Sequence, residues 1–223
     1  MSTSLSHDLA GSIESTLLRY DASEIDIDEL CTGAIWFRFA GVCVFPEYVS
    51  YAAGLLANVA CKVVTVVNFP TGDFALKDTL RQMRTAVSDG ADEIDYVLNI
   101  PAALKGDWQA VAEDVKAVVD LAHANEKALK VILETCLLTH DQKVKACLTA
   151  LDSGADYVKT STGFSTGGAT VDDVRLMRAT VGDQMGIKAA GGIRDRETAF
   201  ALLDAGANRL GTSSALAIIG AIK

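Results

Sequence analysis

The sequence has little of what marks several classes of protein. Only three prolines are present, and no Ser/Gly-rich or single-charge run divides the chain. Lysine and arginine are outnumbered 20 to 29 by acidic residues, and the net charge of −9 argues against nucleic acid as a partner, because such binding needs a basic surface. The longest apolar run near the C-terminus, residues 215–219, is far shorter than the roughly 20 residues that span a bilayer, so we expect no membrane partner.

Signals for disulfides and metals are also missing. The five cysteines leave one unmatched, and none belongs to a C-x-x-C pair. Together with the lack of a signal-peptide pattern, this predicts free thiols and a cytoplasmic location. No cluster of histidine, cysteine and carboxylate residues has metal-ligand spacing, so we expect neither a metal nor another cofactor.

The chain is long enough for one substantial core. It has 223 residues, 50% of them hydrophobic, which predicts a single domain over residues 1–223. Short apolar runs alternate with stretches of helical periodicity, and these runs are too apolar to face water on one side. Such a pattern predicts a parallel sheet covered by helices. The expected strands are residues 12–18, 41–45, 63–67, 93–98, 129–133, 157–159, 186–188 and 208–211.

Helices are expected between these strands. Capping signals at residues 23–26 and 139–142 mark two helix starts, and Thr170 with Asp173 marks a third. Apolar spacing indicates further helices over residues 47–59, 76–87, 108–122 and 195–205.

A short motif repeats along the chain. Gly-Ala-Asp or Gly-Ala-Asn occurs at residues 90–92, 154–156 and 206–208, each time between a helix and a strand. Glycine suits the C-terminus of a helix. The repeated unit favours an α/β fold of the closed (β/α)8 TIM-barrel type over an open doubly wound sheet, and the length lies at the short end of the barrel range of roughly 200 to over 400 residues.

Two lysines stand at the ends of consecutive expected strands. Lys159 closes the strand at 157–159, and Lys188 closes the strand at 186–188. In a TIM barrel the C-terminal ends of the strands form the active site. Side chains alternate along a strand, so both lysines are expected to point into the barrel while Ile187 points outward.

The same alternation sends other charged side chains inward. In residues 93–98 the apolar side chains face the helices, which leaves Glu93 and Asp95 inside. In residues 130–134 Lys130 and Glu134 are left inside for the same reason. These residues are either paired structural charges or groups that carry chemistry, and their convergence where barrel enzymes work favours chemistry.

A buried lysine has a physical use in catalysis. Its neutral amine can attack a carbonyl, and burial and a neighbouring cation both disfavour the ammonium form. Lys188 is therefore expected to favour the neutral amine of Lys159, or the reverse, while Asp95 moves protons.

A phosphate site is expected beside the lysines. Gly163 follows the sixth strand, Gly191 and Gly192 follow the seventh, and Ser213 and Ser214 follow the eighth. Loops after the last two strands of a TIM barrel are the usual phosphate site. Glycines let the backbone approach an anion, and serine hydroxyls donate hydrogen bonds to it.

These motifs resemble those of the deoxyribose-phosphate aldolase family, class I aldolases on a (β/α)8 barrel. The most specific are residues 158–164 (Val-Lys-Thr-Ser-Thr-Gly-Phe) and 187–194 (Ile-Lys-Ala-Ala-Gly-Gly-Ile-Arg), supported by residues 93–95, 130–135 and 211–214. The resemblance runs from about residue 13 to residue 214. It implies a lyase of deoxyribose phosphate catabolism that reversibly cleaves 2-deoxy-D-ribose 5-phosphate to acetaldehyde and D-glyceraldehyde 3-phosphate without a cofactor.

The resemblance also implies residue roles. Lys159 matches the lysine that forms the Schiff base, Lys188 the lysine that tunes it, and Asp95 the aspartate of the proton relay. The implied supporting network is Lys130, Glu14 and Thr16. The implied phosphate-binding positions are Gly163, Gly191, Gly192, Ser213 and Ser214. The implied partners are a sugar phosphate and small aldehydes, and a homodimer is an open alternative for the assembly.

The chain departs from the family pattern in two places. Many members carry Asp-His-Thr-Leu-Leu where residues 14–18 here read Glu-Ser-Thr-Leu-Leu, so Glu14 keeps the charge but adds a methylene. Some members carry a tyrosine near the C-terminus, and no tyrosine follows Tyr157 here. We therefore expect altered relay geometry, with weaker closure over the phosphate or slower proton transfer.

Two other functions are left open by the residues. One is a phosphate-binding barrel isomerase or synthase that relies on carboxylate acid–base catalysis. The other is a non-catalytic sensor of a sugar phosphate. The lysine pair weighs against the sensor, because binding a phosphate does not require lysines shielded from water, and the isomerase or synthase is distinguished by activity that survives Lys159→Ala.

Overall fold

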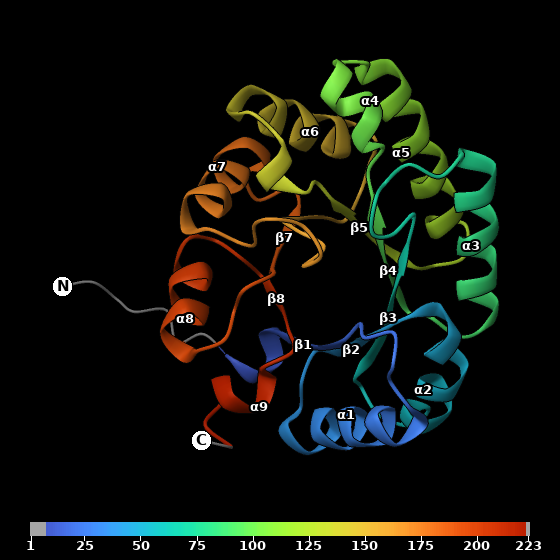
Figure 1. The fold of residues 1–223 in the computed structure, drawn as a ribbon, viewed down its shortest axis with the longest axis vertical. Coiled ribbons are helices and arrows are strands. Elements are labelled where there is room, and N and C mark those ends of the chain that lie inside the picture. The colour runs from blue at the N-terminus through green and yellow to red at the C-terminus, as the bar shows by residue number, and fades with distance from the viewer. Residues whose placement is uncertain (1–7, 222–223) are drawn as a thin grey trace.

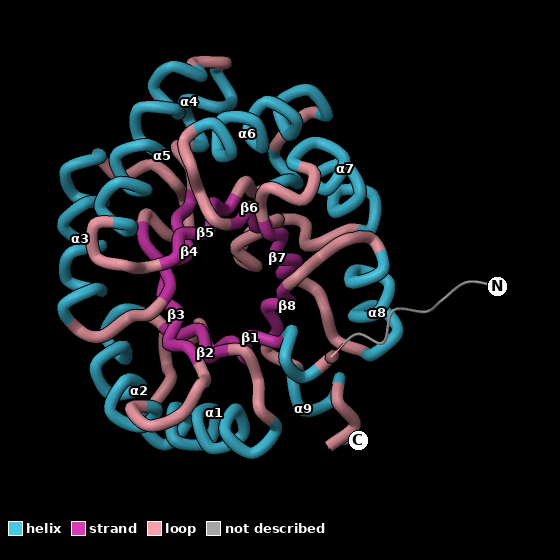
Figure 2. Tube along the Cα trace, turned by 180° about the vertical axis from the view of Figure 1, so that it is seen from behind, coloured by secondary structure: helices cyan, strands magenta, loops and turns pink. Residues whose placement is uncertain are grey.

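The fold is a closed parallel barrel. The computed structural model describes residues 8–221, so residues 1–7 and 222–223 of the predicted domain lie outside the described residues. Eight strands pair side by side in sequence order and close on themselves, which confirms the predicted (β/α)8 barrel (Figures 1 and 2). The strands are β1 (Ile13–Leu17), β2 (Gly41–Val44), β3 (Lys62–Val67), β4 (Glu93–Val97), β5 (Ala128–Ile132), β6 (Tyr157–Lys159), β7 (Gly186–Ala190) and β8 (Arg209–Thr212).

Helices surround the ring of strands on the outside, as Figure 2 shows. The α-helices are α1 (Glu24–Phe37), α2 (Val49–Leu56), α3 (Leu76–Ser88), α4 (Ile100–Lys105), α5 (Trp108–His123), α6 (His140–Asp152), α7 (Val171–Val181), α8 (Arg196–Asp204) and α9 (Ala215–Ile218). Short 3-10 helices are η1 (Ala10–Ser12), η2 (Pro46–Tyr48) and η3 (Thr135–Leu137). The helix expected over 47–59 is thus a 3-10 turn followed by a shorter α-helix, and α4 and α9 were not predicted.

The capping signals act as the sequence predicts. The side chain of Ser23 accepts a hydrogen bond from the backbone N–H of Asp26, and the side chain of Asp26 accepts one from the backbone N–H of Ser23. Thr139 and Gln142 form the same reciprocal capping box. Each box satisfies backbone donors that the first turn of a helix leaves unpaired. These caps fix where α1 and α6 begin, and therefore how the chain leaves β1 and β5.

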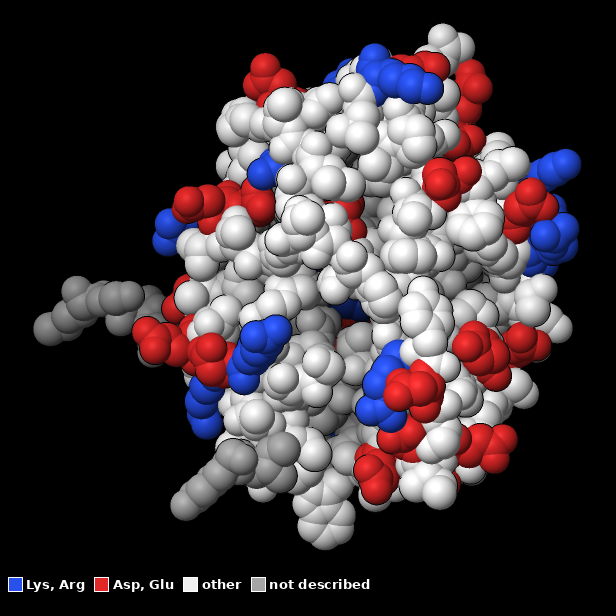
Figure 3. Space-filling model, in the orientation of Figure 1, with Lys and Arg blue, Asp and Glu red and all other residues white. Residues whose placement is uncertain are grey.

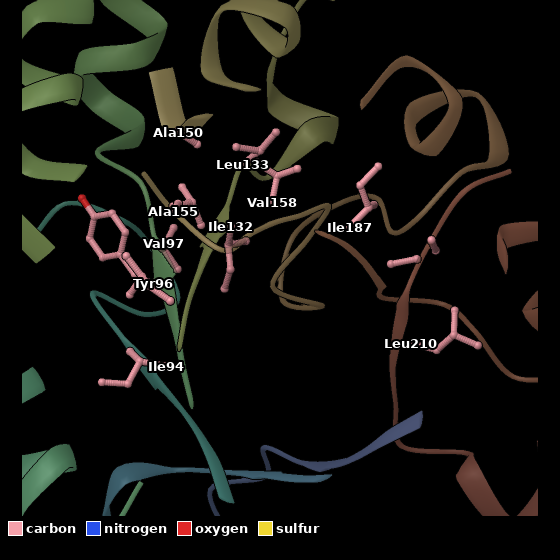
Figure 4. Packing of buried hydrophobic residues seen from close by; sticks show 14 of the residues in the cluster. Ile94, Tyr96, Val97, Ile132, Leu133, Ala150, Ala155, Val158, Ile187 and Leu210 are labelled. Atoms are coloured by element: carbon pink, nitrogen blue, oxygen red, sulfur yellow. The ribbon is translucent and has the colours of Figure 1, made fainter. Parts of the chain in front are cut away.

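Alternation along the strands separates two buried layers. Ile94, Tyr96 and Ile187 project from the strands toward the helices, away from the barrel axis (Figure 4). They join the continuous apolar core between strands and helices. The opposite faces of the strands fill the barrel interior, where most of the fully buried charges lie, and this interior positions the candidate site.

Two further observations lie outside the site. All five cysteines are free thiols. Within residues 8–221, no helix combines the length and the apolar character needed to cross a membrane.

Candidate active site

Lys159 and Lys188 lie side by side in the barrel interior. They are directly paired in the register of β6 and β7, so their side chains leave the sheet on the same face. Lys159 is 3% exposed and Lys188 is fully buried. The prediction that both lysines point inward is therefore confirmed. Figure 3 shows a hollow at the centre of the face in view, with basic and acidic atoms deep inside it.

Asp95 joins the two lysines. Its Oδ2 atom lies 2.7 Å from the Nζ of Lys159 and 2.7 Å from the Nζ of Lys188. The carboxylate is fully buried and projects from the middle of β4, as strand alternation predicts. One oxygen thus accepts a hydrogen bond from each of two amines that come from neighbouring strands.

Lys130 and Glu14 extend this group of charges. The Nζ of Lys130 lies 3.2 Å from Oδ1 of Asp95, 2.5 Å from Oε2 of Glu93 and 3.5 Å from Oε1 of Glu14. The Oε2 atom of Glu14 accepts a hydrogen bond from Lys188. Three lysines and three carboxylates therefore form one buried ion-pair cluster, which we call the central cluster: Glu14, Glu93, Asp95, Lys130, Lys159 and Lys188.

The ion pairs fix the charge states of most of its members. Burial alone would raise the pKa of Asp95, but Lys130, Lys159 and Lys188 outweigh it and hold that pKa well below the ordinary range. Burial opposes the charge of Glu14 too, yet Lys130 and Lys188 lower its pKa. Burial alone would lower the pKa of Lys188, but the carboxylates of Asp95 and Glu14 raise it. Lys188 is thus a permanent cation beside Lys159 at neutral pH.

Lys130 follows the same rule. Burial would lower its pKa, and the surrounding carboxylates, Asp95 first, raise it well above the usual value. Lys130 is fully buried, and its Nζ also stands 5.9 Å from the centroid of the Tyr157 ring. It therefore holds its charge in the interior.

A cavity of about 300 Å³ adjoins Lys159. Four of the five predicted phosphate-binding residues line it, and the fifth, Ser214, does not. Ser214 lines a second pocket beside α1 and α9, which Ser213 lines as well. The backbone N–H of Ser214 donates to Thr212 Oγ1, which turns the chain into α9. The complete lining is Thr16, Leu18, Lys159, Thr162, Gly163, Phe164, Ala190, Gly191, Gly192, Ile193, Arg194, Gly211, Thr212 and Ser213.

The glycines of the cavity are required by the backbone. Gly163, Gly191 and Gly192 have φ values of 87°, 87° and 78°, a left-handed region that other residues rarely adopt. A Cβ on Gly191 would lie 3.0 Å from the Cα of Gly168. The loops after β6 and β7 therefore approach each other closely, with backbone rather than side chains facing the cavity.

Thr16, which the family resemblance implies for the supporting network, and Glu134, which alternation places inside, do not join the central cluster. Thr16 lines the cavity, but its hydroxyl donates to the carbonyl oxygen of Glu14, 3.0 Å away, and not to the central cluster. Glu134 lies beyond the end of β5 with φ 54°, so the strand rule no longer applies to it. Its Oε2 accepts hydrogen bonds from the backbone N–H and the hydroxyl of Thr162, which anchors the loop after β6.

The other half of the interior is apolar. A separate buried cluster is formed by Cys43 on β2, Phe45 directly after β2, and Val64 and Val66 on β3. Burial raises the pKa of the Cys43 thiol to about 11, so this thiol is protonated at neutral pH. The barrel interior thus holds an apolar cluster as well as the central cluster.

Aromatic residues at the mouth were missed by sequence reasoning. Phe164 lines the cavity and packs against Phe69, with ring centroids 5.1 Å apart, and against Phe45 and Tyr20. These rings come from four separate loops, so no local pattern in the sequence links them. Leu18, Arg194 and Thr212 are further lining residues to which no role was assigned.

A metal centre has no candidate among the residues 8–221. No group of three or more histidine, cysteine, aspartate and glutamate side chains in this range could hold an ion. The central cluster pairs each carboxylate with a lysine, and a lysine amine can act as a nucleophile toward a carbonyl.

Comparison with known proteins decides the family. The profile of the DeoC/LacD family aldolases matches residues 8–221. The chain belongs to this aldolase family. A deoxyribose-phosphate aldolase from Streptococcus uberis is 51% identical to this aldolase over 207 residues, which cover 93% of each chain.

Solved structures agree with the family. The aldolase QR15 has a TM-score of 0.90 and 34% identity, over 95% of this chain and 94% of its own. A deoxyribose phosphate aldolase from Aeropyrum pernix, described as a tetramer, has a TM-score of 0.89 and 34% identity over 95% and 89% of the two chains. The fold and the enzyme class expected from the sequence motifs are thus confirmed.

Proposed function

We propose that this aldolase reversibly cleaves 2-deoxy-D-ribose 5-phosphate to acetaldehyde and D-glyceraldehyde 3-phosphate through a Schiff base on Lys159. The observation that carries the proposal is the position of this lysine. It lines a cavity of about 300 Å³, it is 3% exposed, and its nitrogen lies 2.7 Å from a carboxylate that also holds Lys188. An amine in this position can react with a carbonyl compound in the cavity while the neighbouring ion pairs keep their charges.

The first half of the reaction forms the iminium and breaks the carbon–carbon bond. The neutral amine of Lys159 adds to the C1 aldehyde carbon of the open-chain substrate, and the adduct takes up one proton and loses water to leave an iminium. The C2–C3 bond then breaks, its electron pair moves toward the iminium nitrogen, and the C3 hydroxyl gives up its proton. D-glyceraldehyde 3-phosphate leaves, and the enamine of acetaldehyde stays on Lys159.

The second half restores the enzyme. The terminal carbon of the enamine takes up one proton, and water hydrolyses the resulting iminium to acetaldehyde, the neutral amine and one proton, which balances the proton taken up when the first iminium formed. Asp95, a permanent carboxylate hydrogen-bonded to Lys159, is the proposed proton carrier, acting through water. Lys188 is the proposed tuning group, because a permanent cation opposes a second ammonium on Lys159.

The phosphate of the substrate has a proposed place in the same cavity. The cavity is lined by Gly163, Gly191, Gly192 and Ser213, and also by the cationic side chain of Arg194. Backbone N–H groups and a hydroxyl are the donors that an anion needs there. Ser214 is left out of this proposed set, because it lines the second pocket beside α9 and not this cavity.

The assembly and location of the enzyme are also proposals. Ile25 and Trp36 on α1 are 70% and 78% exposed, and exposed apolar side chains of this kind support a homodimer. Sedimentation of the purified chain would measure the assembly. The five free thiols support a cytoplasmic location, which fractionation of the source cells would test.

Turnover tests the function. The purified chain should release acetaldehyde from 2-deoxy-D-ribose 5-phosphate, and Lys159→Met should abolish this release while Lys116→Met, an exposed lysine on α5, retains it. An isomerase or synthase based on the carboxylates would survive Lys159→Met. A sensor would be stabilised against heat by the sugar phosphate without any turnover, which would refute the aldolase.

A further inference from the structure

Glu93 stands at the opposite end of the barrel from Lys159. It is the first residue of β4, whereas Lys159 is the last residue of β6, and all strands run in parallel. Its side chain is 15% exposed and lines a pocket at the N-terminal ends of the strands together with Lys62 and Arg209. Glu93 therefore does not reach the cavity where the reaction is proposed to occur.

Glu93 is nevertheless the nearest carboxylate to Lys130. Its Oε2 lies 2.5 Å from the Lys130 Nζ, compared with 3.2 Å for Asp95 and 3.5 Å for Glu14. Lys130 is fully buried and has to be neutralised by the carboxylates around it. Without Glu93, only Asp95 and Glu14 would neutralise the charge of Lys130, and both of these residues also pair with Lys188.

The two oxygens of Asp95 are divided between the two ends of the central cluster. Oδ1 faces Lys130, whereas Oδ2 is shared by Lys159 and Lys188. If Lys130 lacked its contact with Glu93, it would attract Asp95 more strongly and draw this carboxylate toward the N-terminal end of the barrel. The contact between Glu93 and Lys130 therefore leaves Oδ2 of Asp95 free to hold the two lysines near the cavity.

Charge balance gives Glu93 a second effect. With all members ionised, the three lysines match the three carboxylates Glu14, Glu93 and Asp95. The cluster has one excess negative charge when Lys159 is a neutral amine, and it is balanced again when that nitrogen becomes an iminium. A net charge in a buried site is costly, so the third carboxylate favours the iminium.

We propose that Glu93 is a positioning residue for the aldolase reaction, which stabilises the iminium on Lys159 from the far end of the barrel by neutralising Lys130 and completing the charge balance of the central cluster. The inference rests on the Schiff-base function proposed above. Glu93 touches neither substrate nor reacting atoms, and it acts through Lys130 and Asp95.

Other titratable groups face this cluster. They come from each strand packed around it: Glu14 on β1, Cys43 on β2, Lys62 on β3, Asp95 on β4, Lys130 on β5, Tyr157 and Lys159 on β6, Lys188 on β7 and Arg209 on β8.

Glu93→Gln tests the inference, because it keeps the shape of the side chain and removes one negative charge. Loss of that charge disfavours both the ammonium and the iminium of Lys159. The acid limb of the pH profile of kcat/KM should therefore move to lower pH by about half a unit, while kcat on the plateau falls about tenfold. The amount of acetaldehyde trapped on Lys159 by borohydride should fall in parallel.

Two further variants serve as controls. Glu93→Asp keeps the charge, so its acid limb should stay at the wild-type pH even where kcat falls. Glu113→Gln removes one charge from the exposed face of α5 and should leave the profile unchanged. Urea unfolding of each variant reports how much protein is folded, and a purely structural loss lowers the plateau without moving the acid limb.

The outcomes separate the two proposals. If the wild type traps acetaldehyde on Lys159 but the profile of Glu93→Gln matches that of Glu113→Gln, the role of Glu93 is wrong and the Schiff-base function stands. If the wild type traps nothing on Lys159, the proposed function fails, and the role of Glu93 fails with it.

Discussion

Lys159 and Lys188 are direct partners in the register of β6 and β7. In a parallel pair, partners in register place their side chains on the same face of the sheet, so each amine reaches the same oxygen of Asp95. The relationship depends on register: a shift of either strand by one residue would turn one lysine outward among the helices. The site is thus built into the pairing of the barrel itself.

Asp95→Asn should damage both stability and activity. The change removes the carboxylate that three buried lysines share, and breaking a buried ion pair on one side leaves an uncompensated charge. We expect the free energy of unfolding, measured in urea, to fall by about 3 kcal/mol and kcat to fall about a hundredfold. Asp120→Asn, at an exposed position of α5, is the matched control; equal stability of the two variants would contradict the arrangement of the central cluster.

The central cluster predicts how stability depends on acid. Asp95 and Glu14 have ordinary pKa values of 3.8 and 4.5, and both values are lowered in the folded protein. Unfolding below about pH 4.5 therefore takes up protons, and stability that is fully present above this pH is lost as the pH falls toward the folded pKa values. Urea midpoints measured between about pH 6 and pH 3 should decline less steeply for Glu14→Gln than for the wild type. Identical slopes would show that Glu14 has no depressed pKa.

Gly191→Ala should weaken recognition of the phosphate. Gly191 has φ 87°, and an added Cβ would lie 3.0 Å from the Cα of Gly168, so the loop has to move. We expect KM for 2-deoxy-D-ribose 5-phosphate to rise about tenfold, with little change for 2-deoxy-D-ribose, which lacks the phosphate. Gly106→Ala is the matched control, because Gly106 has φ 78° at the end of α4 and lines no part of this cavity. A rise of the same size for both sugars would argue against a phosphate site at this loop.

Ser213 and Ser214 should differ although they are neighbours. Ser213 lines the cavity with Lys159, whereas Ser214 does not. Ser213→Ala is expected to raise KM for the sugar phosphate severalfold through the loss of one hydrogen bond to an anion. Ser214→Ala should leave KM near the wild-type value. The reverse result would restore the role that the family resemblance implies for Ser214.

Much of the fold could be predicted from the chain because its signals are local. Strand alternation oriented Lys159, Lys188 and Asp95 correctly, and the capping boxes marked where α1 and α6 begin. The short helix α4 was missed, since it depends on a cap by Asn99 and a left-handed Gly106 rather than on apolar periodicity. Such a helix is too short for the 3.6-residue period to register.

The details of the site depended on contacts between distant parts of the chain. Glu134 does not follow the alternation of the strand, because its backbone is left-handed. Its carboxylate accepts a hydrogen bond from Thr162 and is not part of the central cluster. The contact between Glu93 and Lys130 follows from the register of β4 and β5 and the reach of a lysine side chain. Neither could be read from spacing in the sequence, because both depend on how the elements meet in space.

The most direct test is the site of covalent trapping by acetaldehyde. The wild-type protein is incubated with acetaldehyde, reduced with borohydride, digested and analysed by mass spectrometry. We expect one ethyl group on Lys159 and none on the fully buried Lys130 or Lys188. Stable modification of Lys188 instead, or an unmodified Lys159 in folded protein, would contradict the central claim that Lys159 forms the Schiff base.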